Sequence, residues 1–194
     1  MIIHYSEEIC KNNFYERNHV MQTAYKLFSS GNVLCPVCHG SMTLHGSYER
    51  NIIDTAGDLH KGWIAQGYCG VCKKYHSIIP SFIMPYKQYS AEVVEKAILE
   101  HEELGSINNS SCQADESTIY RWINQFKERG ASAVGWLISM LYSIYDQHIS
   151  VLELRKEGML KRLDRLTQRL LPIKTGRIIG RTNIILTNHN HGFV

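Results

Sequence analysis

The chain has 194 residues, of which 44% are hydrophobic and 20% are charged, and this composition excludes a wholly disordered protein. Twenty-one Lys and Arg side chains against 18 Asp and Glu give a formal net charge of +3, which excludes a uniformly basic coat that binds nucleic acid by charge alone. The charge is unevenly spread, because residues 81–154 carry five basic and ten acidic side chains, whereas residues 155–181 carry nine basic and two acidic ones.

The first 32 residues are weakly amphipathic, with apolar members that include Val20, Tyr25 and Phe28, and they predict a helical lead-in. They lack the apolar core of a secretion signal. The longest apolar stretch, residues 131–145, is shorter than the ~20 residues that a membrane span needs. We therefore expect a cytoplasmic protein that does not associate with membranes.

A small β domain is predicted over residues 33–80. Alternating apolar and polar residues indicate strands at 42–53 and 59–68, joined by turn-forming residues at 54–58. A shorter third strand is expected at 75–79, before Pro80. A Cys-x-x-Cys pair lies at each end of this hairpin, as in a zinc ribbon.

These paired cysteines, Cys35, Cys38, Cys69 and Cys72, are the strongest functional signal in the sequence. Two such pairs in a protein without a secretion signal indicate a metal site rather than disulfides. Four thiolates complete the tetrahedral shell of one Zn²⁺ ion and leave no position for a substrate, so the predicted ion is structural.

Other interpretations of these residues remain open. The four cysteines could be unrelated free thiols, or one pair could be a redox motif. His39 and His76 lie beside the two pairs and could replace one sulfur, although positions outside the metal shell are the simpler interpretation. Cys10 and Cys112 stand alone and are interpreted as small apolar side chains.

Residues 81–130 predict a helix-turn-helix-like domain. After an extended connector at 81–88, Ser90 is a suitable N-cap for a helix that Gly105 ends. A second helix is predicted over 115–129, ending at Gly130, with an apolar inner face formed by Ile119, Trp122, Ile123 and Phe126.

The remaining residues predict C-terminal helices followed by a tail. Residues 131–172 have a helical period, with Gly158 dividing two helices and Pro172 ending the second. The tail, residues 173–194, is expected to pair as a strand or to remain loose. The predicted fold class is α+β: a small zinc-ribbon β-hairpin domain, a mostly α-helical domain and C-terminal helices with a basic end.

The outer face of the predicted 116–128 helix carries side chains that suit the major groove of DNA. Arginine can bind guanine bidentately, and asparagine or glutamine can bind adenine, while hydroxyls at a helix N-terminus can bind phosphate with backbone amides. The candidate residues are Ser117, Thr118, Tyr120, Arg121, Asn124 and Gln125. The alternative is an amphipathic helix with a solvated polar face, which is favoured by the polar stretch 106–113 and by the nearby acidic residues Glu100, Glu102 and Glu103.

The basic end supplies candidates for non-specific phosphate contacts. Lys161, Arg162, Arg165 and Arg169 surround a stripe formed by Leu163, Leu166 and Leu170. Alternatively, this is a solvated helix face whose leucines pack on the domain, or on a second copy of the chain in a homodimer.

No catalytic centre is expected. The acidic residues after Gly130 lie on segments with a helical pattern. The region after Gly130 is also too short to form the sheet that holds two metal ions in the nuclease core of a transposase. The sequence also lacks a GxSxG motif, a P-loop and a dinucleotide-binding fingerprint. We therefore expect neither an enzyme nor a small-molecule substrate.

The order of motifs resembles a known arrangement. The first cysteine pair is followed by residues 45–50 (His-Gly-Ser-Tyr-Glu-Arg), the second pair, the connector 79–90 with its Pro-Tyr-x-x-Tyr-Ser motif, and residues 117–122. Over residues 33–130 the chain resembles a bacterial family of unknown function with a zinc ribbon and a helix-turn-helix, similar to the N-terminal DNA-binding region of insertion-sequence transposases. The resemblance implies a role in binding double-stranded DNA, as a regulator or accessory protein of a mobile element. Residues 106–114 depart from it, because a usual second helix would be more apolar.

Two hypotheses therefore stand. The first is a DNA-binding protein that reads base pairs with the 116–128 helix. The second is a non-catalytic adaptor, in which the zinc ribbon and the long C-terminal helices bind a partner or a second copy through Trp136, Met140 and the leucine stripe.

Overall fold

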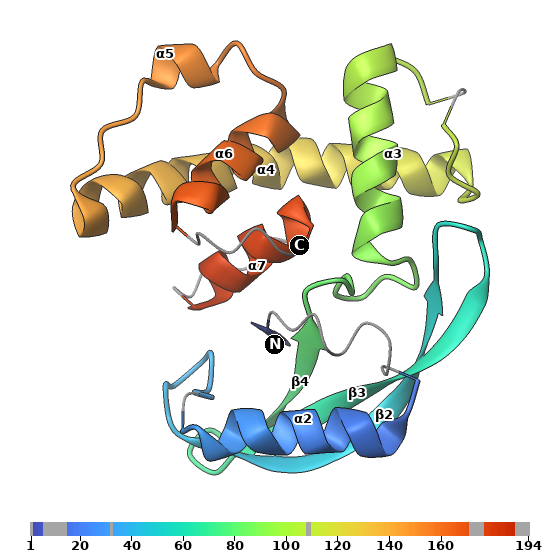
Figure 1. Ribbon diagram of the computed structural model, residues 1–194, viewed down its shortest axis with the longest axis vertical. Helices are drawn as coiled ribbons and strands as arrows, with labels where there is room; N and C mark the ends of the chain where they lie inside the picture. Colours follow the sequence, from blue (N-terminus) through green and yellow to red (C-terminus); the bar gives the residue numbers. More distant parts are fainter. Residues whose placement is uncertain (1, 6–14, 32, 108–109, 171–176, 189–194) are drawn as a thin grey trace.

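The computed structural model describes residues 2–5, 15–31, 33–107, 110–170 and 177–188. They form an α+β fold in which a four-stranded sheet lies beside a group of helices (Figure 1). Strands β2 (Met42–Ile53), β3 (Leu59–Cys69) and β4 (Lys74–Pro80) form an antiparallel meander. Strand β1 (Ile2–Tyr5) pairs parallel to β4, so the order across the sheet is β1-β4-β3-β2.

The three predicted strands are confirmed, and so is the turn between the first two. The side chain of Asp54 accepts the backbone N–H groups of Ala56 and Asp58 at 2.8 and 3.0 Å, which closes the β2–β3 turn in the manner of an Asx turn. The register that follows pairs Met42 with Cys69, so the start of β2 lies beside the end of β3.

The N-terminal prediction is wrong in part. Helix α2 (Arg17–Ser29) occupies the second half of the expected helical lead-in, but residues 2–5 form β1 instead. The position of β1 depends on backbone pairing with β4, more than 70 residues away in the sequence. Local periodicity does not predict such long-range pairing. Helix α2 lies on one face of the sheet (Figure 1), where the Arg17 guanidinium stacks 5.2 Å above the ring of Trp63.

Helix α3 (Ala91–Leu104) has the predicted ends. Ser90 is the N-cap, and its hydroxyl accepts the backbone N–H of Val93 at 3.4 Å. Gly105 terminates the helix in the left-handed region with a φ of 67°. The connection to the next helix, residues 105–115, is longer than the turn of three to four residues that joins the helices of a standard helix-turn-helix.

The second predicted helix does not end at Gly130. Helix α4 runs from Glu116 to Tyr145 without interruption, so the domain boundary predicted between residues 130 and 131 falls inside a helix. Gly130 is buried, and a Cβ atom added there would lie 2.9 Å from the side chain of Met159. The glycine therefore allows close packing of the helix that begins at Met159. Its sequence position alone does not distinguish this role from helix termination.

The C-terminal region contains three further helices. Helices α5 (Val151–Leu154) and α6 (Met159–Leu170) are separated at Gly158, as predicted, while Pro172 lies outside the described residues. The tail prediction is wrong, because residues 178–188 form helix α7 (Ile178–Asn188). A Cβ atom at Gly180 would lie 2.2 Å from the carbonyl oxygen of Ser81, so the glycine lets α7 pack directly on the connector that follows β4.

Two hydrophobic cores support these elements. The first lies between the sheet, α2 and the cysteine turns, and its fully buried members include Ile64, Ile78 and Ile79. The second lies among α3, α4, α6 and α7, and includes Leu137, Leu163 and Leu166. Within the part of the chain that the structure describes, no helix combines the length and apolar character that crossing a membrane requires.

Candidate functional site

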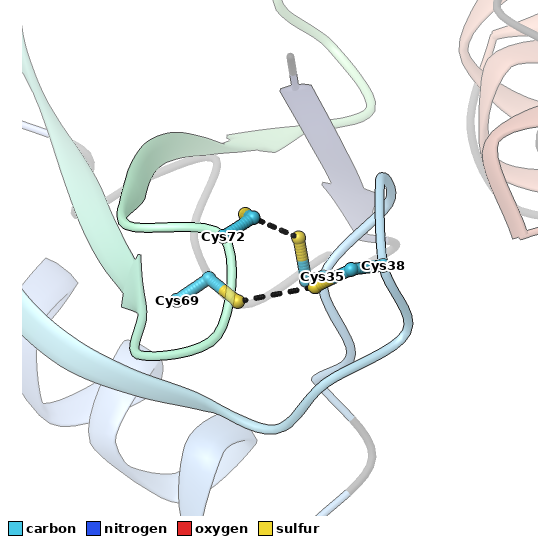
Figure 2. A group of neighbouring side chains, drawn as sticks. All are labelled: Cys35, Cys38, Cys69 and Cys72. Carbon is cyan, nitrogen blue, oxygen red and sulfur yellow. Dashed lines mark hydrogen bonds between the residues drawn. The ribbon is translucent and has the colours of Figure 1, made fainter.

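The four predicted metal ligands converge from two turns (Figure 2). Cys35 and Cys38 lie in the turn before β2, while Cys69 ends β3 and Cys72 lies in the turn that leads to β4. The sulfur atoms of Cys35 and Cys72 are 3.5 Å apart and those of Cys38 and Cys69 are 3.4 Å apart. All four sulfurs lie within 4.8 Å of one another.

This spacing fits a tetrahedral metal ion. At a Zn–S distance of ~2.3 Å, the edges of a regular ZnS₄ tetrahedron measure ~3.8 Å. Two sulfur separations in the protein, 3.5 and 3.4 Å, lie slightly below that value, and none exceeds 4.8 Å. Thiolates are also the donors that soft and borderline metals prefer. The four cysteines are therefore compatible with a closed metal site that has no open position.

Backbone hydrogen bonds shape the first cysteine turn. The N–H of His39 donates to the carbonyl of Cys35 at 2.8 Å, and the N–H of Cys35 donates to the carbonyl of Gly40 at 2.9 Å. The N–H of Val37 points at the sulfur of Cys35, 3.4 Å away. Such N–H···S contacts stabilise a thiolate, so the turn is arranged for a charged sulfur.

The thiols differ in their tendency to ionise. The backbone N–H of Cys72 donates to the sulfur of Cys69 and lowers the pKa of Cys69 to about 6. Burial, followed by hydrogen bonds from neighbouring cysteines, raises the pKa of Cys72 to about 12. Four negative sulfurs crowded in one partly buried place repel one another, and a divalent cation removes this repulsion when it binds.

The two histidines beside the cysteines lie outside this group. His76 is 1% exposed, and its Nε2 atom lies 3.4 Å from the sulfur of Cys35, so it contacts a candidate ligand rather than adding a fifth. His39 is exposed and belongs to no cluster of candidate ligands among the described residues. Cys112 is partly buried against the second core, and Cys10 lies outside the described residues.

A second group of candidate ligands, Asp54, Asp58 and His60, lies at the β2–β3 turn. His60 Nε2 is 2.7 Å from the Asp54 carboxylate, and this hydrogen bond, more than any other contact, lowers the pKa of Asp54. The second Asp54 oxygen accepts the two backbone N–H groups of the turn. These bonds explain the cluster as turn structure without a metal.

The candidate DNA-reading residues lie on the first turns of α4, on the side away from the second core. The inner-face residues Ile119, Trp122, Ile123 and Phe126 are buried as predicted. Ser117, Tyr120, Arg121 and Asn124 are exposed, whereas Thr118 and Gln125 are partly buried. Arg121 donates to the hydroxyl of Thr118 at 3.1 Å, and Gln125 accepts a hydrogen bond from the Lys87 ammonium at 2.8 Å.

The four candidate phosphate contacts of the basic end divide into two pairs. Arg162 donates to the carbonyls of Arg155 and Glu157, and Arg165 lies 2.9 Å from the Glu157 carboxylate. Both guanidinium groups therefore hold the α5–α6 connection together. Lys161 and Arg169 are exposed to solvent.

The structure also shows a pocket that the sequence pattern does not predict, because residues 81–88 have only the pattern of an extended connector. Its volume is about 420 Å³, and it lies between β2, β4 and this connector. The lining residues are Tyr48, Arg50, Tyr75, Ser77, Ile79, Tyr86, Lys87 and Gln88. The Tyr-rich motif of the connector was the one sequence signal that pointed toward it.

Comparison with known proteins shows that part of the chain is similar to a family of unknown function. A model described as "Domain of unknown function (DUF6431)" matches residues 35–122. The match begins at the first candidate metal ligand and ends within α4, so it spans the four cysteines, the connector and α3. The expected resemblance to a family of unknown function is thereby confirmed for this region. No curated protein and no solved structure matches the chain.

Proposed function

We propose that this is a zinc-stabilised DNA-binding protein that reads base pairs with the outer face of the first turns of α4. The observation that carries the proposal is this polar, exposed face, held by a buried inner face on the same turns. From the order of its motifs, we further propose that the chain is related to transposase DNA-binding regions and acts as a regulator or accessory protein of a mobile element.

One zinc ion is the proposed occupant of the four-cysteine site. The sulfur separations suit Zn²⁺, and a closed four-thiolate shell stabilises a fold rather than catalysing a reaction. In this role the ion ties the turn before β2 to the turn after β3 and so supports the sheet on which the connector to α3 is built.

Packing holds helix α4 in a fixed orientation, as a DNA-reading helix requires. Trp122 packs edge-on against Tyr89 of the connector, with 4.9 Å between ring centroids, and this contact fixes the rotation of the helix. Arg121 is then placed outward for a bidentate contact with guanine, and Asn124 for a contact with adenine. Glu116 and Glu128 on the same helix repel phosphate, whereas Lys127 and Arg129 on it attract phosphate.

The test compares Arg121→Ala and Arg121→Lys with the unchanged protein, using labelled duplex fragments from its own genomic locus at two salt concentrations. If α4 reads DNA, Arg121→Ala costs ~1–3 kcal/mol and relaxes base preference. Arg121→Lys keeps the charge but loses the bidentate geometry, so it retains salt-dependent affinity and loses selectivity. Lys26→Ala, on the exposed side of α2, is the matched control. Equal affinity and selectivity in all four proteins would refute the proposal.

A second candidate function, a protein-interaction adaptor, is favoured by a different observation. Large apolar side chains are exposed at the end of α4 and on α5: Trp136, Tyr142, Ile144, Tyr145, Val151 and Leu152. Of the predicted interface residues, Trp136 is exposed, whereas Met140, Leu163 and Leu166 are buried in the second core and cannot contact a partner. A partner or a second copy would instead contact the exposed end of α4.

A further inference from the structure

The pocket between β2, β4 and the connector lies on the face of the sheet opposite α2. Side chains alternate between the two faces of a strand, and Arg17 of α2 contacts Ser47 of β2. Tyr48 and Arg50 therefore point to the other face, where they line the pocket with Tyr75 and Ser77 of β4. Its volume of about 420 Å³ falls within the range of small-ligand sites.

The pocket is cationic and contains no carboxylate among its lining residues. The Arg50 guanidinium donates to the carbonyls of Met84 and Lys87 at 2.7 and 2.5 Å, so its position is fixed. Burial, together with the nearby charge of Arg129, lowers the pKa of Lys87 to about 8. Because the lining residues include no carboxylate, an anion from outside the protein can pair with these two cations.

The pocket also presents two largely exposed aromatic rings, those of Tyr86 and Tyr75. Tyr86 is 85% exposed and adopts a left-handed backbone with a φ of 57°, a conformation that is rare and strained for a bulky residue. Tyr75 is 52% exposed, and its ring lies 4.9 Å from that of Tyr68. Strained and exposed groups of this kind gather where a ligand is bound.

We propose that this pocket binds one nucleotide unit, with its phosphate on Arg50 and Lys87 and its base against the ring of Tyr86 or Tyr75. Aromatic stacking together with a cationic groove is the usual way in which proteins hold unpaired nucleotides. This proposal rests on the proposed function, because the nucleotide is taken to be part of the DNA that the protein binds. Lys87 donates to Gln125 on the outer face of α4, so the pocket adjoins the surface that we propose for DNA.

The experiment measures binding of three probes to the full zinc-loaded chain: deoxyadenosine monophosphate, deoxyadenosine without phosphate, and a single-stranded hexamer of deoxyadenosine. The variants are Tyr86→Gly, which removes the ring and suits the positive φ, and Lys87→Gln, which removes the charge. Tyr25→Ala and Lys26→Gln, on the exposed side of α2, are the matched controls. Equal zinc content and melting temperature establish that every variant is folded.

We expect each pocket variant to weaken binding of the monophosphate or the hexamer at least fivefold, with neither control affected, and the unphosphorylated nucleoside to bind more weakly than the monophosphate. Binding of the monophosphate alone supports a free nucleotide as the ligand, and preferential binding of the hexamer supports a DNA strand. Unchanged binding in both pocket variants, absence of binding by any probe, or equally strong competition by inorganic phosphate would overturn the proposal.

These outcomes distinguish the proposal for the pocket from the proposal that α4 reads DNA. Loss of duplex selectivity in Arg121→Lys, with no effect of the pocket variants on any probe, retains the proposed function and overturns the pocket. Nucleotide binding that depends on Tyr86 and Lys87, with duplex binding indifferent to Arg121, retains the pocket and refutes the reading role of α4.

Discussion

At the scale of single residues, the side chain that links the candidate metal site to the core of the sheet is His76. It is almost completely buried, and its ring nitrogen lies against the sulfur of Cys35. A histidine in this place can donate a hydrogen bond to a thiolate, which reduces the negative charge on the sulfur and fixes its direction. Groups that orient metal ligands in this way typically change metal affinity by 10–100-fold.

The corresponding prediction concerns His76→Gln. We expect zinc affinity to fall ~10-fold, since the orienting contact to Cys35 is lost while all four sulfurs remain. Competition with a chromophoric chelator measures the change. His39→Gln, at an exposed position in the adjacent turn, serves as the control and should retain full affinity. Equal losses in the two variants would mean that His76 acts through general packing only.

A second residue-scale prediction concerns the pH dependence of stability. Glu95 is buried, and burial raises the pKa of its carboxyl, although the backbone N–H of Ile179 donates to it at 3.2 Å. A carboxyl with a raised pKa favours the neutral form in the fold, so its ionisation destabilises the protein above the folded-state pKa. This penalty is relieved as the pH falls through the folded-state pKa toward that of the unfolded chain.

Glu95→Gln should therefore melt at a higher temperature than the unchanged protein at pH 7–8, and the difference should close on acidification. Glutamine retains an oxygen that accepts the N–H of Ile179. Thermal unfolding across this pH range measures the effect, with the exposed Glu103→Gln on the same helix as the control. A lower melting temperature at pH 7 would show instead that attraction to Arg181 dominates.

At the scale of elements, helix α4 joins two chemically different surfaces. Its first turns expose polar and charged side chains, whereas its last turns expose Tyr142, Ile144 and Tyr145. The helix continues across Gly130, where the sequence pattern predicted an end. One rigid element therefore carries both the face proposed for DNA and the apolar end, so association through that end would set the spacing between two reading faces.

The apolar end of α4 predicts self-association. Ile144 and Leu152 are 56% and 74% exposed, and large apolar side chains that face solvent are candidates for protein contacts. We expect a concentration-dependent dimer that the double variant Ile144→Lys and Leu152→Lys converts to a monomer, as measured by light scattering. Leu104→Lys, at an exposed position at the end of α3, should leave the dimer intact. If the unchanged protein is a monomer at every concentration, this expectation is contradicted, and the apolar surface would have to bind a different protein.

At the scale of the whole molecule, the predictable and unpredictable parts of the fold differ in the range of the interactions that determine them. The β2–β3 hairpin and the Ser90 cap depend on neighbouring residues, and local patterns indicated both. Strand β1 and helix α7 depend on distant contacts, including the approach of Gly180 to Ser81. The cysteine cluster was predictable because the spacing of its ligands is itself a local pattern. The pocket around Arg50 and Lys87 was not, since it joins β2 and β4 to a connector that begins 28 residues after the end of β2.

The two cores of the molecule should respond differently to removal of zinc. Cys35 and Cys69 belong to the sheet core, whereas the helical core is built from α3, α4, α6 and α7 and contains none of the four metal ligands. Loss of the ion leaves the thiolates uncompensated and removes the link between the two cysteine turns. We therefore expect a chelator to loosen the sheet core while most of the helical signal in circular dichroism remains.

Tryptophan fluorescence can localise this change. Trp63 lies on β3 beside α2, while Trp122 packs in the helical core. Chelation should shift the emission of the unchanged protein, and this shift should be lost in Trp63→Phe and retained in Trp136→Phe. Restoring zinc should reverse it. A loss of the helical signal at the same time as the change in fluorescence would instead show that the two cores unfold as one cooperative unit. The contact between α7 and β1 would then couple the cores, and the stability of the whole unit would depend on the metal.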